Sequence, residues 1–343
     1  MSFRVSLRPS GHELEVERDE SVLDAALREG IGIAYGCRNG SCNSCRARLL
    51  EGDVSYGSKL PNALTQAQAD AGWTLLCQAT PQTDLVIEAH EFSSATDATI
   101  RTLPCRVKSK TQTAHDVMIL ELALPEGERL AFVAGQYIDI LLRNGRRRSF
   151  SLANAARNDG ILSLHIRQVP DGEFSSYVFN HLKERALIRI RGPLGGFFLR
   201  EPSLRTLIFL AGGTGFAPIK SIIESALQAD SPQPIRLYWG VRAKRDLYMH
   251  ELAQSWASSH PNLTYVPVLS EPQEGDDWTG RTGFVHQAVA DDFSDMTDCE
   301  VYSSGPPVMV DAAWQTFAEH GLLGEHHFSD AFEFAYETGA DTI

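Results

Sequence analysis

Four cysteines of this chain have a spacing suited to redox chemistry: Cys37, Cys42, Cys45 and Cys77. The first three are separated by four and then two residues, and the fourth returns much later. This is the C-x4-C-x2-C…C spacing of a plant-type 2Fe-2S cluster, in which four thiolates hold two irons. Gly36 and Gly40 give the loop the backbone freedom to wrap closely. A zinc site more usually has two C-x2-C pairs, and disulfides do not explain the spacing, so the sequence predicts a cluster.

A glycine-rich turn follows the strand-like run 207–210 and precedes a helical pattern. Its residues 213–218 read G-x-G-x-x-P. Glycines after a strand let backbone N–H groups approach a pyrophosphate, and a helix N-terminus favours the negative charge. Pro218 suits the first helical turn, where no N–H is required. The turn differs from the G-x-G-x-x-G of a standard dinucleotide fold, and a turn that binds nothing is the alternative.

Length and composition indicate an ordinary multidomain protein. The 343 residues predict two or three domains, and 43% hydrophobic with 22% charged residues is typical of a soluble chain. No apolar run is long enough for a bilayer, and the start lacks signal-peptide architecture. Six cysteines, four of them in a metal pattern, suit a reducing cytoplasm. We therefore expect a cytoplasmic protein without a membrane partner.

Charge is distributed unevenly along the chain, whose formal net charge is −13. Residues 96–200 are basic, whereas residues 1–95 and 201–343 are acidic. Such asymmetry can indicate nucleic-acid binding, or it can serve a cofactor that carries phosphate. The motifs favour the cofactor, so no nucleic-acid partner is expected.

The hydrophobic pattern changes twice along the chain. Residues 3–7 and 13–16 predict a β-hairpin, and Ser21 with Asp24 resembles a capping box before a helix that ends at Gly30. A linker is expected at Phe92–Thr102. Further strands are predicted at Arg46–Leu50, Leu85–Ile87, Cys105–Lys108, Val117–Leu122, Tyr137–Leu142, Ser149–Leu152, Ile161–Arg167 and Ile188–Arg191.

The six runs from residue 105 to residue 191 indicate an antiparallel barrel, interrupted by one helix pattern at Phe174–Leu182. From residue 204 strands and helices alternate, which predicts a parallel α/β sheet. Its expected strands are Thr206–Leu210, Ile235–Trp239, Thr264–Leu269 and Glu300–Ser303, and its expected helices include Ile219–Leu227 and Val308–His320.

Residues 1–90 resemble a plant-type ferredoxin of the β-grasp fold. The strand Arg148-Ser149-Phe150-Ser151, the segment 172–175 and the glycine turn resemble the ferredoxin–NADP reductase superfamily. That resemblance implies that Arg148 reaches FAD phosphate, Phe150 lies on the flavin and Ser151 hydrogen-bonds flavin N5. The usual tyrosine is phenylalanine here. Arg146 and Arg147 are as readily a solvated basic turn.

Other residues enter the predicted sites through the same resemblance. Gly172 and Ser175 would hold the FAD pyrophosphate, and Ser304 stands where many relatives have a cysteine beside the nicotinamide. Ser151 and Ser304 are the predicted catalytic residues. The remaining predicted cofactor contacts are His165, Gly192, Gly195, Gly213, Thr214, Gly215, Pro218, Gly240, Arg242, Asp246, Gly305, Pro306 and Phe332.

Cofactor preference is ambiguous from local charge. Arg242, Lys244 and Arg245 could bind the 2′-phosphate of NADP, whereas Asp246 and the acidic balance of residues 201–343 favour the ribose hydroxyl of NADH. The resemblance to NADH-using reductases also favours NADH.

The fold class expected is multidomain α+β and α/β. It combines a β-grasp 2Fe-2S ferredoxin domain at 1–92, a linker at 93–102, a flavin-binding barrel at 103–200 and a nucleotide-binding domain at 201–343. This order resembles the reductase components of bacterial ring-hydroxylating dioxygenases and multicomponent monooxygenases, and CDP-6-deoxyglucoseen reductase.

The resemblance implies an NADH-dependent electron-transfer reductase that contains FAD and a 2Fe-2S cluster. It would serve a transiently docked protein acceptor: an oxygenase component, a soluble diiron monooxygenase or a deoxysugar dehydratase. A redox-sensing or nucleic-acid-binding flavoprotein is the alternative.

Several other residues are expected to carry no chemistry. Cys105 and Cys299 are predicted to be buried packing thiols. The adjacent pair His326-His327 cannot place two ligands on one helical face and is expected at the surface.

Overall fold

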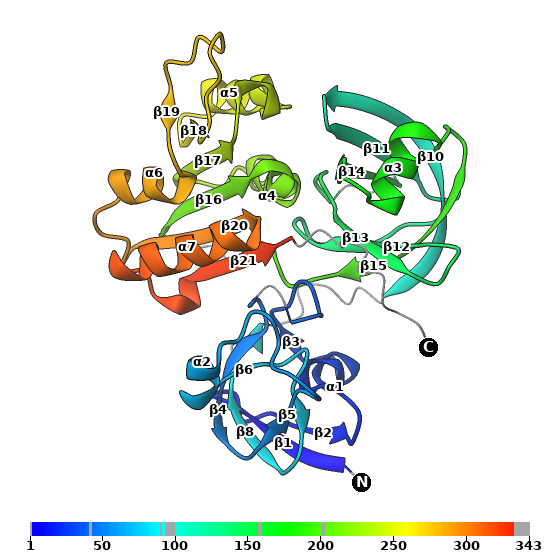
Figure 1. Ribbon diagram of the computed structural model, residues 1–343, viewed down its shortest axis with the longest axis vertical. Helices are drawn as coiled ribbons and strands as arrows, with labels where there is room; N and C mark the ends of the chain where they lie inside the picture. The colour runs from blue at the N-terminus through cyan, green and yellow to red at the C-terminus, as the bar shows by residue number, and fades with distance from the viewer. Residues whose placement is uncertain are drawn as a thin grey trace. The chain divides into compact units, whose positions relative to one another are not determined.

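The computed structural model describes residues 2–40, 43–89, 91–92, 100–156, 160–200 and 203–332 (Figure 1). Among these residues no helix is long and apolar enough to cross a membrane. The chain divides into two compact units. The first comprises Met1–Asp97 with Gly195–Phe197 and Phe328–Glu333, and the second comprises the remainder.

A mixed five-stranded sheet packed on a helix forms the first unit. The sheet order is β2-β1-β8-β4-β6, with β1 antiparallel to β2 and parallel to β8. Helix α1 buries an apolar face, and the Ser21 side chain caps it by accepting a hydrogen bond from Asp24 N–H. The elements are β1 (Ser2–Arg8), β2 (Glu13–Glu17), α1 (Val22–Arg28), β3 (Gly32–Ile33), β4 (Arg46–Glu51), β5 (Val54–Ser55), α2 (Gln66–Asp70), β6 (Trp73–Leu75), β7 (Thr80–Pro81), β8 (Leu85–Glu88) and β9 (Glu91–Phe92). The predicted hairpin, helix cap and β-grasp class are confirmed.

An antiparallel barrel forms the first half of the second unit. Its strand order is β13-β12-β15-β10-β11-β14, and a bridge between Leu152 and Leu164 joins the two ends. Alternate residues of the strands face a continuous apolar core. The elements are β10 (Arg101–Ala114), β11 (Val117–Ala123), β12 (Tyr137–Leu141), β13 (Arg147–Ser151), β14 (Ile161–Arg167), α3 (Glu173–Asn180) and β15 (Leu187–Leu194).

Strand β10 is much longer than the strand predicted at Cys105–Lys108. It begins at Arg101, inside the expected linker, and continues to Ala114. Its polar ends are held by backbone pairing, since β15 pairs with it from Arg101 and β11 pairs with it as far as Ala114. Backbone pairing on both edges therefore extended a strand whose composition indicated a loop.

A parallel sheet covered on both faces by helices forms the rest of the second unit, with the strand order β19-β18-β17-β16-β20 (Figure 1). Strand β21, apart from His327, belongs to the first unit. Ile208, Leu210 and Tyr238 pack with α6 and α7 on one face. On the other face the ring of Trp239 stacks on Phe216 of α4 at 3.9 Å. The elements are β16 (Thr206–Gly212), η1 (Gly213–Gly215), α4 (Phe216–Gln228), β17 (Ile235–Val241), η2 (Lys244–Asp246), α5 (His250–Ser259), β18 (Leu263–Leu269), β19 (Arg281–Thr282), α6 (Val285–Asp292), β20 (Cys299–Gly305), α7 (Pro307–Glu319), η3 (Gly324–His326) and β21 (His327–Ala331).

The barrel core gives a prediction for stability. Leu120 is fully buried in β11, whereas Leu187 in β15 is 72% exposed. Leu120→Ala leaves a cavity and should lower the free energy of unfolding by about 2–5 kcal/mol. Leu187→Ala, the matched control, should change it by less than about 0.5 kcal/mol. Denaturant titration of the two variants makes the comparison, and equal losses would contradict this account of the core.

Candidate cofactor-binding sites

The cysteine loop of the first unit is wound tightly by left-handed backbone. Arg38, Gly40 and Asn43 have φ values of 59°, 81° and 58°. A Cβ on Gly40 would lie 2.7 Å from Cβ of Pro61, so the loop also packs closely on a neighbouring turn. The predicted ligand Cys42 lies outside the described residues.

Two hydrogen bonds, one from the backbone and one from a side chain, join the segments around the other three cysteines. Leu76 N–H, next to Cys77, donates to the carbonyl of Cys45 at 3.1 Å. On the other side of Cys77, the side-chain amide of Gln78 donates through Nε2 to the carbonyl of Arg38 at 3.1 Å. Arg38 is the neighbour of Cys37. Cys45 and Cys77 are buried and Cys37 is half-buried. Such a sheltered set of thiols at one tightly wound loop fits a 2Fe-2S cluster, as the spacing predicted.

The two other cysteines lie in apolar cores of the second unit. Burial raises the pKa of Cys105 to about 12 and that of Cys299 to about 11. Both therefore stay protonated at neutral pH, and a protonated thiol is a poor metal ligand. Their predicted burial as packing residues is confirmed.

The predicted flavin strand is β13. Phe150 is half-buried, and its ring centroid lies 5.4 Å from that of Phe174 at a tilt of 47°. Ser151, at the end of the strand, is buried. Arg148 is half-buried, and its guanidinium donates to the carbonyl of Arg147 at 2.9 Å. The strand therefore presents an aromatic ring, a hydroxyl and a cation within four residues.

The predicted pyrophosphate turn precedes α3. Gly172 is the N-cap residue, and no side chain caps this helix end. A Cβ on Gly172 would lie 2.6 Å from Oγ of Ser175. The Ser175 hydroxyl accepts from Val169 N–H at 3.2 Å, so it holds the turn itself. The uncapped first N–H groups of α3 suit a phosphate, as a helix N-terminus does in general.

His165 is a fully buried histidine in β14. Its Nδ1 lies 2.8 Å from the hydroxyl of Tyr248, and its Nε2 has no hydrogen-bond partner among the described residues. Burial, and secondarily the charge of Lys220, lowers the pKa of His165 to about 3, so the ring is neutral. A buried, unpaired ring nitrogen is the kind of group that a bound cofactor can satisfy. Nothing in the sequence pattern pointed to Tyr248 as its partner.

Two turns at the carboxyl ends of parallel strands are packed against each other. Gly213, in the turn after β16, has φ of 55°, and a Cβ on Gly215 would lie 2.0 Å from the carbonyl oxygen of Ser304 in β20. Thr214 lies between these glycines, and Pro218 lies in the first turn of α4 as predicted. Ligands of open α/β sheets bind at this strand edge.

Ser304 itself is fully buried, and its Oγ has no partner among the described residues. Gly305 has φ of 152°, and Pro306 is the N-cap residue of α7. A Cβ on Gly212 would lie 2.8 Å from Cδ of Pro306, so the two turns meet here as well. The close backbone approach and the unsatisfied hydroxyl fit a bound nicotinamide dinucleotide.

The remaining predicted contacts are dispersed. A Cβ on Gly192 would meet Ile138, and one on Gly240 would meet Val285, so both glycines serve close packing. Arg242 is exposed. Asp246 caps η2 by accepting from Ala243 N–H at 3.0 Å. Gly195, with φ of 94°, and Phe332 fall within the first unit.

The surface position expected for His326 and His327 is not what the structure shows. His326 is half-buried. His327 is buried, with Nε2 2.8 Å from Oγ of Ser303 and its ring stacked on Trp314. Residues of a β-strand alternate between its two faces, and His327, the first residue of β21, lies on the face toward Ser303 and Trp314.

Three family models match the chain in succession. Residues 5–82 match a 2Fe-2S iron-sulfur cluster binding domain, residues 104–199 an oxidoreductase FAD-binding domain, and residues 209–315 an oxidoreductase NAD-binding domain. Together with the cysteine loop and the two cofactor turns, they define a class. The chain belongs to the family of iron–sulfur flavoprotein reductases.

Individual relatives match over almost their whole length. The chain is 41% identical to the CDP-6-deoxy-L-threo-D-glycero-4-hexulose-3-dehydrase reductase of Yersinia pseudotuberculosis, covering 97% of this chain and 99% of the relative. It is 33% identical to the reductase component of phenol 2-monooxygenase of Pseudomonas sp. strain CF600, covering 100% and 98%.

A solved structure of an Amycolatopsis cytochrome P450 reductase is 31% identical to the chain, with a TM-score of 0.76 over 96% of this chain and 98% of that one. The ferredoxin reductase in carbazole 1,9a-dioxygenase is 26% identical, with a TM-score of 0.69 over 97% of this chain and 99% of that one. The predicted family and fold class are confirmed.

The buried histidine gives a prediction for pH dependence. The pKa of His165 falls from its ordinary 6.5 to about 3 on folding. Between these values the unfolded chain binds a proton that the folded chain does not. The contribution of the neutral His165 to the free energy of unfolding is therefore complete above the pKa of the unfolded chain. It is lost as the pH falls toward the pKa of the folded chain, by at most about 1.4 kcal/mol per pH unit.

His165→Gln should flatten this dependence. The free energy of unfolding of the two proteins, measured between about pH 7.5 and pH 5, makes the test. His181→Gln alters an exposed histidine and serves as the control. Parallel curves for wild type and His165→Gln would show that His165 is not buried in its neutral form.

Proposed function

We propose that this reductase takes hydride from NADH and passes electrons, through its FAD and 2Fe-2S cluster, to a separate protein that docks transiently. The observation that carries the proposal is the presence of all three cofactor-binding domains in one chain. FAD, when bound, supplies the step between a two-electron donor and a one-electron carrier. The protein's own residues bind, orient and shield these groups.

The acceptor that we favour is a dehydratase acting on a CDP-linked 6-deoxyhexulose. Support comes from the relative at 41% identity, which is named as a reductase of such a dehydrase. An oxygenase component is the second candidate, because the phenol 2-monooxygenase reductase component matches the chain over its full length at 33% identity. The cytoplasmic location expected from the cysteine content is part of the same proposal.

Residue roles in the flavin site follow from the geometry of β13. Ser151, buried at the end of the strand, would direct its hydroxyl to the reacting flavin nitrogen, and Phe150 would cover the ring. Arg148 would place a positive charge at a phosphate. Ser304, buried with a hydroxyl that no described residue hydrogen-bonds, would bind the nicotinamide end. The boundaries proposed for the domains remain 1–92, 103–200 and 201–343.

We also propose that the reductase uses NADH in preference to NADPH. Arg242, Lys244 and Arg245 are all exposed, but Lys244 donates to the carbonyl of Asp276 at 2.9 Å and is thereby engaged within the protein. The acidic balance of residues 201–343 disfavours an additional phosphate.

The acceptor experiment follows NADH oxidation by the purified reductase with each candidate partner. We expect a CDP-6-deoxyhexulose dehydratase to be reduced faster than an oxygenase component, and NADH to exceed NADPH in kcat/KM. Transfer to the true partner should slow as salt is raised, whereas ferricyanide reduction should change little, since docking charges are screened. Faster transfer to the oxygenase, or a preference for NADPH, would refute the corresponding part.

The cluster assignment predicts a difference between two cysteine variants. Wild type should contain about two irons and two sulfides per chain. Cys45→Ser removes a proposed ligand and should abolish the cluster while FAD is retained, because the flavin binds elsewhere. Cys105→Ser, the matched control in the barrel core, should retain both irons. Iron and sulfide analysis with the visible spectrum provides the readout, and normal iron in Cys45→Ser would disprove the ligand.

The flavin assignment predicts opposite effects of two substitutions in β13. Ser151→Ala should slow flavin reduction by NADH about 10- to 100-fold with little loss of FAD, because it removes a hydrogen bond to the reacting atom. Arg148→Ala should mainly lower FAD occupancy, because it removes a charge-assisted bond. Rapid-reaction reduction and FAD titration separate the effects, and equal changes in both would contradict the division of roles.

A further inference from the structure

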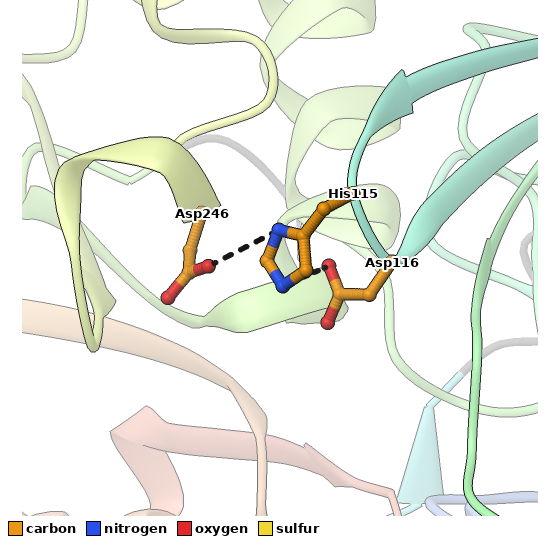
Figure 2. Close-up of side chains that lie close together, drawn as sticks. All are labelled: His115, Asp116 and Asp246. Atoms are coloured by element: carbon orange, nitrogen blue, oxygen red, sulfur yellow. Dashed lines mark ion pairs between the residues drawn. The ribbon is translucent and has the colours of Figure 1, made fainter.

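Three side chains of the second unit form a cluster, two from the turn between β10 and β11 and one from η2. Figure 2 shows the imidazole of His115 between the carboxylates of Asp116 and Asp246. His115 Nδ1 lies 3.8 Å from Oδ1 of Asp246, and Nε2 lies 3.8 Å from Oδ1 of Asp116. One donor atom from each residue can be chosen so that all lie within 4.8 Å of one another.

Both carboxylates are held by their other oxygen. Oδ2 of Asp116 accepts from Nε of Arg167 at 2.8 Å, and Oδ2 of Asp246 accepts from Ala243 N–H at 3.0 Å. In each aspartate Oδ1 is the oxygen on the side of His115. Ligand carboxylates in metal sites are oriented in this way by outer hydrogen bonds.

Asp246 supplies an observation that a surface ion pair does not explain. Its side chain is only 10% exposed, and its Oδ1 is buried without a hydrogen-bond partner among the described residues. A buried carboxylate oxygen left unsatisfied is costly, and 3.8 Å to His115 is too long for a hydrogen bond. The atom therefore faces His115 in the cluster without a hydrogen bond from any described residue.

The nitrogen and oxygen atoms of the cluster indicate which kind of metal ion it can bind. With a neutral imidazole, the two carboxylates and the Arg167 guanidinium leave one net negative charge at the cluster. One imidazole nitrogen with two carboxylate oxygens suits zinc, and a zinc site that keeps an open position has three protein ligands and a water. Bonds of about 2.0–2.2 Å place tetrahedral ligand atoms about 3.4 Å apart. The ligand atoms lie within 4.8 Å of one another and would have to approach by up to about 1.4 Å, which the 45% exposed ring of His115 can do in part by turning one nitrogen toward both oxygens.

We propose that His115, Asp116 and Asp246 form a binding site for a divalent transition metal of the zinc class. The ion would link the hairpin of the flavin barrel to the segment that follows β17. Asp246 would then act as a metal ligand, which makes this use distinct from a contact with the nucleotide ribose.

Equilibrium dialysis of the holoenzyme against zinc chloride tests the site. Zinc and iron are measured in the same sample, so that an intact cluster is verified. Wild type should bind about one zinc ion per chain, and its thermal midpoint should rise with zinc, because a ligand of the native state stabilises it. His115→Ala and Asp246→Asn should lose both effects, whereas His181→Ala, which removes an exposed histidine elsewhere, should keep them.

X-ray absorption at the zinc edge completes the test. The expected first shell contains only nitrogen and oxygen. Sulfur in that shell would overturn the proposal, since it would place the zinc at the cysteine loop. Absence of bound zinc, or equal binding by wild type and His115→Ala, would also overturn it. Binding of magnesium in preference to zinc with the same dependence on the variants would overturn the assignment of the metal class.

Discussion

The nucleotide-binding half of this protein depends on one close approach between backbones. Gly215 leaves so little room that a Cβ would lie 2.0 Å from the carbonyl oxygen of Ser304. Only glycine allows the turn after β16 to lie directly on the end of β20. This approach brings the turn that suits a pyrophosphate beside the turn that suits a nicotinamide, at the edge where open parallel sheets bind ligands.

Two buried polar atoms near these turns have no hydrogen-bond partner in the part of the chain that the structure describes. His165 presents an unpaired Nε2 and Ser304 an unpaired Oγ. Such atoms reduce stability unless a ligand satisfies them, and they concentrate where a protein is built to bind something. Because the pKa of His165 is low, its ring is neutral over the physiological pH range and would contact that ligand as a neutral group.

Sequence patterns predicted most of the architecture, because they report local periodicity and chemistry. Cysteine spacing, the cap at Ser21 and the alternation of strands and helices each act within a few residues. The patterns failed where pairing with backbone distant in the sequence determines the secondary structure. Strand β10 continues through polar residues because β11 and β15 pair with it. His327 is buried because of its strand, although its adjacent polar sequence indicated a surface position.

The sites show the same division. Motifs predicted Ser151, Gly215 and Ser304 as cofactor contacts, because their neighbours in sequence carry the signal, and these assignments stay predictions. The Tyr248 partner of His165 and the approach of His115 to Asp246 join residues far apart in the chain, and no local pattern reports them. The left-handed conformation of Arg38 was equally hidden, since non-glycine residues rarely adopt it.

Helix α4 has a mechanical consequence for the reductase. Its Lys220 donates to the carbonyl of Ala153 at 2.9 Å, and its Ser221 donates to the carbonyl of Asn154 at 2.6 Å. These carbonyls follow the predicted flavin strand, and the same helix begins directly after the glycine-rich turn Gly213–Gly215. Helix α4 therefore connects the two segments, and a movement of one relative to the other would break the bonds of Lys220 and Ser221 to these carbonyls, leaving Lys220 to its ion pair with Glu224. Binding and release of the nicotinamide should then proceed by small displacements of side chains, because these hydrogen bonds fix the spacing between the two segments.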